Sequence, residues 1–527
     1  LEAIMWRALI LLLAISFAVN AQQLGHVEFP TSGSEKAQAH FLRGLAALHS
    51  FWYEEARDEF RESTKIEPDF AMGYWGEAMT YNHPLWSEQD LEAARQVLTR
   101  IKDSPKLTDR ERVYIMAVRL LYGAGDKRAR DVAYSAEMEK IYRAYPDDLD
   151  AAAFYSLSLL ALVRPEEKSY RLQAKAGAIA LDVYQKNPNH PGAAHYIIHA
   201  FDDPDHAILA LSAARRYADI APEAHHARHM PSHIFLQLGM WTEAAASNES
   251  AWQASDAWMK RKNLSPSVRD YHSLHWLLYI YLQQGRYTDA EKLLNLMKKV
   301  MSESTYDNKL RPGYYENNYA NMAAAFVVET ERWDLADQLF PPNVTPQQTS
   351  NSESHGTHDP GATVRYSNAS QTLPVFVRAL SAAIRGSNNV DYHPGGIREF
   401  EVAALSASMK NDHARAIELM KQATALEEQG PAPSGPPPLI KPTHELFGEI
   451  LLRARKPAEA AEQFRISLLR QPNRARSLLG AARAAAQSSN QPAALSAYTT
   501  LIEQWQQADT GLPELQEARA YLKQAKR

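Results

Sequence analysis

Amphipathic helical segments follow one another along almost the whole chain. Arg110–Tyr122 places apolar residues on one face at helical spacing, and Thr108 precedes it as a candidate cap. Longer helical units follow at His190–Tyr217, Ala224–Ser255 and Asp270–Met301. Alternation of apolar and polar residues is nowhere long enough to build a sheet. The pattern therefore predicts an all-α protein.

Two segments interrupt the helical pattern. Residues 341–371 are rich in Ser, Thr, Asn, Pro and Gly, which predicts a long irregular exposed loop. Residues 429–442, QGPAPSGPPPLIKP, form a Pro-rich linker that can join two bodies or lie across a groove. The boundaries predict helical repeats at 22–340 and 372–428, and a final repeat pair at 443–527.

Small and aromatic residues repeat in a fixed order at both ends of the chain. A small residue, a second small residue, an aromatic ring and a helix-ending proline occur as Gly44, Ala56, Phe60, Pro68 and again as Gly448, Ala460, Phe464, Pro472. This order resembles the tetratricopeptide-repeat (TPR) superfamily over about two thirds of the chain. The strings YWGEAMTYNHPLW, HARHMPSHIF and KPTHELFGE resemble uncharacterised exported bacterial TPR proteins. The resemblance implies a right-handed superhelix of about ten helical pairs with a concave groove.

Histidines recur with the period of one repeat in the middle of the chain. His195 and His199 are four residues apart, and His229 and His233 are four apart as well. Corresponding members of the two pairs are separated by 34 residues, the length of one TPR unit. Side chains four apart share a helix face, and neighbouring repeats can bring two such faces together. These four histidines are candidate ligands of one transition metal: zinc, copper or iron.

Two details bear on that metal hypothesis. Asp202 and Asp203 lie one turn beyond His199, where they can orient imidazoles from the second coordination shell or cap the next helix. Pro231 lies between His229 and His233. Either a new helix begins there, or the proline makes a kink within the pair.

Further polar residues fall on the face that the resemblance assigns to the groove. Alignment of the turns LGMWTEA and QGRYTDA matches the next repeat to this histidine-rich face. We expect a ligand-binding groove lined by His226, His272, His275, Tyr279, Asn318 and Asn321.

Composition and the N-terminus limit the possible partners. The chain of 527 residues has a formal charge of −5 and scattered Lys and Arg, so nucleic acid is excluded as a partner.

Residues 1–21 contain MWRALILLLAISFAVNA, typical of a signal peptide cleaved near Ala21. The apolar run is short for a membrane span, so we expect a periplasmic or secreted protein without a stable span after cleavage.

Three functions are compatible with these patterns. The first is binding of a peptide, a protein or a polar small molecule in the histidine-lined groove. The second is a metal-dependent enzyme, a hydrolase or an oxidase, with His195, His199, His229 and His233 around the ion. The third is a structural scaffold for envelope assembly. Catalytic signatures such as HExxH or a phosphate-binding glycine loop are absent from the sequence.

Overall fold

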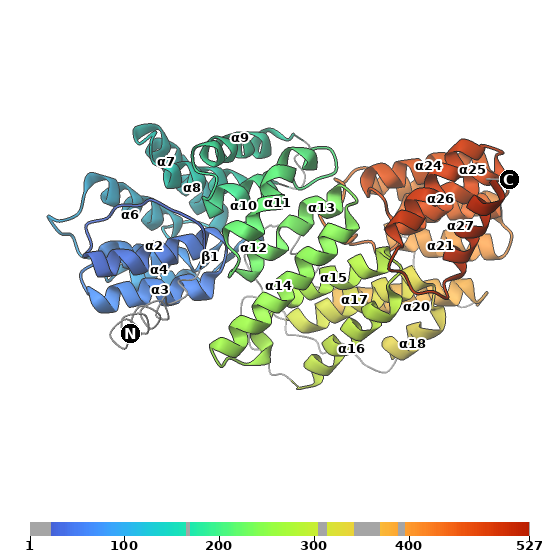
Figure 1. Cartoon of the computed structure of the whole chain (residues 1–527), viewed down its shortest axis with the longest axis horizontal. Helices are drawn as coiled ribbons and strands as arrows, with labels where there is room; N and C mark the ends of the chain where they lie inside the picture. Colours follow the sequence, from blue (N-terminus) through green and yellow to red (C-terminus); the bar gives the residue numbers. More distant parts are fainter. Residues whose placement is uncertain (1–22, 165–168, 304–312, 342–368, 388–395, 526–527) are drawn as a thin grey trace, which may run out of the picture.

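Consecutive helices pack in pairs throughout the computed structural model, which describes residues 23–164, 169–303, 313–341, 369–387 and 396–525 (Figure 1). The blue N-terminal helices form one end of the molecule, the green central helices lie in the middle, and the red C-terminal helices form the other end. The predicted all-α, TPR-like organisation is confirmed. In the described part of the chain the only strands, β1 (Asn82–His83) and β2 (Glu88–Gln89), form a two-residue antiparallel pairing around η2 (Pro84–Trp86).

The helices have the following bounds. The N-terminal helices are α2 (Glu35–His49), α3 (Tyr53–Ile66), α4 (Ala71–Met79), α5 (Leu91–Leu98), α6 (Asp109–Leu121), α7 (Lys127–Ala144), α8 (Leu149–Leu160) and α9 (Arg171–Lys186). The central helices are α10 (Pro191–Ala200), η3 (Ala207–Ala210), α11 (Leu211–Ile220), α12 (His225–His229), α13 (Pro231–Gln237), α14 (Trp241–Arg261), η4 (Pro266–Val268), α15 (Tyr271–Gln283) and α16 (Tyr287–Glu303). The later helices are α17 (Tyr314–Thr330), η5 (Trp333–Leu335), α18 (Ala336–Leu339), α20 (Ala369–Ile384), α21 (Ile397–Met409), α22 (His413–Glu427), α23 (Thr443–Arg453), α24 (Pro457–Arg470), α25 (Ala475–Gln487), α26 (Gln491–Gln504) and α27 (Pro513–Ala525).

Glycines let the helix pairs approach closely at both ends of the chain. Phe60 is buried between Gly44 and Gly76, and Phe464 is buried in the same way between Gly448 and Gly480. A methyl group on Gly480 would lie only 2.2 Å from the Phe464 ring. The small and aromatic positions of the sequence repeat are therefore the contacts that hold neighbouring repeats together.

The C-terminal repeats pack back against the central ones. Trp241 Nε1 donates to the carbonyl oxygen of Asn473 over 2.9 Å, and Trp505 Nε1 donates to that of Gln283 over 2.9 Å. One continuous apolar core extends from Leu24 to Ala484, with a smaller cluster around Trp505. The C-terminal repeats are thus held against the central repeats by contacts far apart in the sequence.

Two predicted segments lie largely beyond the described residues. These are the predicted signal peptide, residues 1–21, and nearly all of the predicted loop at 341–371, with α20 beginning at Ala369. Within the described ranges, no helix combines the length and apolar character needed to cross a bilayer.

Candidate metal centre

Three histidines from two repeats meet at the first site, which we call triad 1. His195 and His199 project from α10, and His226 projects from α12. The Nε2 atom of His195 lies 3.0 Å from His199 Nε2 and 3.2 Å from His226 Nε2. His195 is fully buried, whereas the other two histidines are half-buried. Three ring nitrogens therefore converge on one point at the edge of the interior.

A second site, triad 2, repeats this arrangement one unit further along. His229 ends α12, His233 lies in α13 and His272 lies in α15. His229 Nε2 is 3.1 Å from His233 Nε2, and the donor atoms of all three lie within 4.8 Å of one another. Pro231 begins α13, but Met230 keeps helical backbone angles, so the i, i+4 pair survives the interruption.

The structure divides the four ligands expected from the sequence between two sites. His195 and His199 belong to triad 1, and His229 and His233 belong to triad 2. Each triad is completed by a histidine that the sequence assigned to the ligand groove, either His226 or His272. The triads adjoin each other, because the ring centroids of His199 and His233 are 6.1 Å apart and those of His226 and His229 are 6.0 Å apart.

Oxygen acceptors fix the orientation of the buried imidazole in each triad. His195 Nδ1 donates to the backbone carbonyl of His49 over 2.8 Å, and His229 Nδ1 donates to Asn248 Oδ1 over 2.7 Å. The Asn248 amide is itself oriented, since its Nδ2 donates to the Ala244 carbonyl. With the proton on Nδ1, each neutral ring presents its Nε2 lone pair to the centre of the triad. Convergent lone pairs repel one another unless a proton or a cation lies between them.

The two aspartates beyond His199 have different environments. Asp202 Oδ2 accepts from His233 Nδ1 over 2.6 Å, and Oδ1 accepts from Gln237 Nε2 over 3.3 Å. Asp202 therefore orients a candidate ligand from the second shell. Asp203 accepts instead from the backbone N–H groups of Asp205 and His206, so it caps the following turn.

Burial keeps five of the six triad histidines uncharged. It lowers the pKa of His195 and of His229 to about 3. Burial together with neighbouring imidazoles also lowers the pKa of His199, His226 and His272 well below the ordinary histidine value. All five imidazoles are thus neutral near pH 7, which is the form that binds metal ions.

A third buried cluster has different chemistry. His49 Nε2 donates to Asp150 over 2.8 Å, and His190 Nε2 lies 3.4 Å from the same carboxylate oxygen. His190 Nδ1 accepts from the Ala193 N–H, which places the ring proton on Nε2, facing Asp150. Both Nε2 atoms then carry hydrogens that face a carboxylate. His49 is held by Asp150 and by the Tyr196 hydroxyl, and its own carbonyl orients triad 1.

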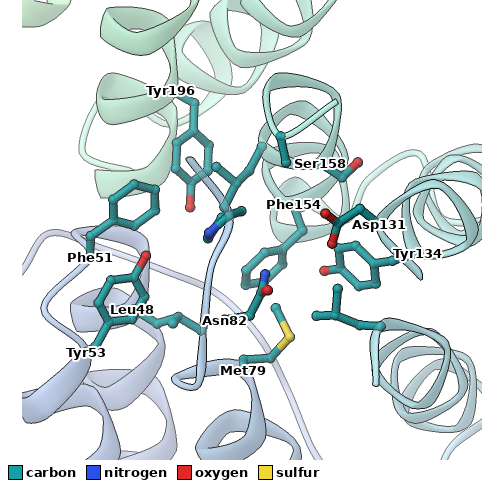
Figure 2. Close-up of a pocket in the computed structure, with 14 residues that line it drawn as sticks. Leu48, Phe51, Tyr53, Met79, Asn82, Asp131, Tyr134, Phe154, Ser158 and Tyr196 are labelled. Atoms are coloured by element: carbon teal, nitrogen blue, oxygen red, sulfur yellow. The ribbon is translucent and has the colours of Figure 1, made fainter. Parts of the chain in front are cut away.

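Aromatic rings surround both triads. The Phe51 ring centroid is 4.3 Å from that of His195, and the Trp276 centroid is 4.2 Å from that of His233. Behind Phe51 lies a cavity of about 30 Å³, shown in Figure 2, with Tyr196, Met79 and Phe154 in its wall. The N-terminal Met and aromatic side chains therefore line a mainly apolar space beside triad 1.

The Pro-rich strap, residues 429–442, lies across the inner surface next to triad 2. The Pro433 carbonyl accepts from Gln237 Nε2 over 2.9 Å, and Gly435 lies against the Trp276 ring. Two arginines hold other parts of the strap: Arg470 donates to the Pro431 carbonyl and Arg398 to that of Pro438. A segment of the chain itself thus packs beside triad 2.

Four residues expected in an open groove lie in the interior. His275 and Tyr279 are 3% and 2% exposed, and Asn321 and Asn318 are 3% and 9% exposed. Both asparagine amides donate to carbonyls of their own helix. These side chains contact protein, whereas His226 and His272 lie in the triads.

A buried ionic network lies near the C-terminus. Arg474, fully buried, donates to Glu445 through two bonds of 2.7 and 3.0 Å. It also donates to the Tyr279 hydroxyl over 2.9 Å and to Glu329. The guanidinium therefore joins the C-terminal repeats to α15 and α17.

Glu401 is a buried acid outside this network, and replacing it by Gln is expected to stabilise the protein at pH 7. Neither carboxylate oxygen has a hydrogen-bond partner among the described residues. Burial, reinforced by Glu427, raises the pKa of Glu401 well above its ordinary value. The unfolded chain releases this proton near pH 4.3, so stability falls as the pH rises from there towards the folded pKa.

Glu401→Gln removes that loss, with an expected gain of about 1–2 kcal/mol at pH 7 and little change at pH 4. Urea titrations at both pH values measure the difference. Glu462→Gln, at an exposed position, is the matched control. An equal gain at both pH values would contradict the assigned protonation.

Comparison with known proteins gives only distant structural similarity. No protein-family model and no curated protein sequence matches the chain. The TPR domain of P58(IPK) aligns over 93% of this chain and 99% of that chain, with 12% identity and a TM-score of 0.21. Yeast Tom70 aligns over 93% and 96%, with 13% identity and a TM-score of 0.29. The TPR-like character of the protein therefore rests on its own helical pairs and on their glycine and phenylalanine contacts.

Proposed function

We propose that the protein is a metal-dependent enzyme that binds two transition-metal ions, one in each histidine triad. The observation that carries this proposal is the convergence of Nε2 atoms in both triads at separations of 3.0–3.2 Å. Two imidazole ligands on one ion, each about 2.0–2.1 Å from it, lie about 2.9–3.4 Å apart at ordinary coordination angles. The spacing therefore suits ligands around a common ion.

Three protein ligands leave a coordination position for a reactant. Catalytic zinc sites keep such a position for water, and copper and iron sites keep it for water or an oxygen species. His199, His226, His233 and His272 are half-buried, so the triads border solvent on one side. This arrangement supports a reaction at the metal, hydrolytic or oxidative, more than a purely structural ion.

Peptide binding along a histidine-lined groove has less support. The histidines converge instead of lying in a row, and the Pro-rich strap covers the surface beside triad 2. Tyr279 and Asn321 are buried against protein. We keep export as part of the proposal, because the N-terminal apolar segment is typical of a signal peptide.

Elemental analysis of untagged protein is expected to give two metal ions per chain. His199→Ala removes a ligand from triad 1, and His272→Ala removes one from triad 2, so each variant should retain about one ion. The double variant should retain none. These two side chains are half-buried, which limits the damage to the core.

His206→Ala is the control, since His206 is outside both triads and its side chain is 38% exposed. It should retain two ions. A folded parent protein that holds no zinc, copper or iron after dialysis against each would rule the proposal out, as would metal retention unchanged in the double variant.

A further inference from the structure

We propose that the two ions are copper(I) and that the pair reacts with dioxygen. This inference rests on the proposed function and names the metal and the reactant of the same site. It is carried by the donor atoms of the triads, the charges around them and the closeness of the two sites.

The donor set consists only of imidazole nitrogen. Each triad presents three imidazoles, and no carboxylate of the described residues belongs to either one. The sequence contains no cysteine that could supply a thiolate. Imidazole suits copper, zinc, iron and nickel, whereas sites with carboxylate oxygen suit harder cations. Three imidazoles add no negative charge, so each site keeps the full charge of its ion.

Little negative charge lies nearby to offset that of the ions. Asp202 bonds to His233 of triad 2. Asp270 lies near this triad, but its carboxylate accepts from His225 and from the Ser273 N–H at the start of α15. Triad 1 is oriented by the His49 carbonyl, which is uncharged. The surroundings therefore supply two carboxylates, those of Asp202 and Asp270, for two ions.

The closeness of the two triads and their apolar surroundings make the charge of the bound ions important for the choice of metal. The triads adjoin at two pairs of rings about 6 Å apart, with Phe51 and Trp276 packed against them. Two divalent ions repel each other about four times as strongly as two monovalent ions at the same separation, and apolar walls reduce the screening. Two monovalent copper ions therefore repel each other much less at this site than two divalent ions would.

Two adjacent copper(I) ions can together supply the two electrons that reduce dioxygen to the peroxide level. Each copper(I) gives one electron and becomes copper(II), the oxygen–oxygen double bond becomes a single bond, and two protons from solvent give hydrogen peroxide. The balanced reaction is 2 Cu⁺ + O₂ + 2 H⁺ → 2 Cu²⁺ + H₂O₂. A cavity of about 30 Å³, lined mainly by apolar side chains, lies on the far side of Phe51 from His195 (Figure 2).

The test uses the full-length, untagged protein freed of metal and loaded with copper(I) without air. After removal of loosely bound copper, two ions per chain are expected. Addition of oxygenated buffer should then consume about one dioxygen per two coppers, followed with an oxygen electrode, and peroxide should appear in solution. His199→Ala should bind one copper and lose at least tenfold in oxygen uptake. His206→Ala, outside the triads, should match the parent.

The outcomes separate this inference from the proposed function. Two bound coppers without oxygen uptake, or retention of two zinc ions but no copper(I), would overturn the inference and leave the two-ion centre standing. Uptake that is unchanged in His199→Ala would also overturn it, because isolated coppers would then suffice. Retention of none of copper, zinc and iron would overturn both proposals.

Discussion

Loading both triads with metal is expected to raise the free energy of unfolding by about 5 kcal/mol at free-ion concentrations about 100-fold above the dissociation constants. Each ion contributes about 2.7 kcal/mol by mass action under these conditions. The folded chain gathers three imidazole nitrogens at each triad, from two helices at triad 1 and from three at triad 2, whereas the unfolded chain does not. Denaturant titrations of metal-free and metal-loaded protein measure the difference, and a chelator should reverse it.

Variants show whether the stabilisation comes from the triads. The double variant His199→Ala, His272→Ala should respond to metal by less than about 1 kcal/mol, while each single variant should keep about half of the response. His206→Ala should respond like the parent. An equal response in the double variant would place the stabilising ions elsewhere and contradict the assignment.

Replacement of Arg474 by Met is expected to destabilise the protein by about 3–5 kcal/mol. Arg474 is fully buried, and its loss leaves the carboxylates of Glu445 and Glu329 in the interior without their main cationic partner. Those charges cost far more than the lost bonds would suggest, because water cannot reach them. Unfolding by urea, followed by circular dichroism, gives the free energy.

Arg483→Met is the control from the same C-terminal helix. Arg483 pairs with Glu517, and both side chains are more than a third exposed. Its replacement should cost no more than about 1 kcal/mol. Adding Glu445→Gln and Glu329→Gln to the Arg474 variant should recover part of the loss, and a loss unchanged by them would show that buried charge is not the cause.

The helical repeats could be predicted from local sequence because their determinants are local. Apolar spacing defines the helices, and the glycines and aromatic rings at repeat positions define how neighbours pack. The 34-residue period also predicted that the pairs at His195 and His229 occupy equivalent places. In the structure, the two pairs occupy corresponding positions, one in triad 1 and the other in triad 2.

The division of the histidines into two triads could not be predicted in the same way. His226 lies 31 residues after His195, whereas His272 lies 43 residues after His229. The second separation is longer because the long helix α14 lies between His229 and His272. Which ring reaches which pair depends on helix rotation and on the bend at Pro231, neither of which spacing reveals. The partner Asn248 carried no sequence signal of its own.

The buried positions of Tyr279, Asn321 and Glu445 depend on long-range packing. The sequence pattern had assigned Tyr279 and Asn321 to the ligand-binding groove. The C-terminal repeats cover this face through Arg474 and the Trp241 and Trp505 contacts. No local sequence pattern predicts that the C-terminal repeats pack against the central ones, because the contacting residues are far apart in sequence.

The return of the C-terminal repeats also affects the order in which the molecule folds. Most solenoid contacts join neighbouring units, so each unit can form on the one before it with little loss of chain entropy. The contact between Asn473 and Gly239 spans 234 residues, and that between Ala475 and Gln283 spans 192. Such closures become favourable only after the intervening helices have shortened the chain between them. We therefore expect the junction around Arg474 to form late, with the C-terminal repeats docking on the central ones only after the helices between them have formed.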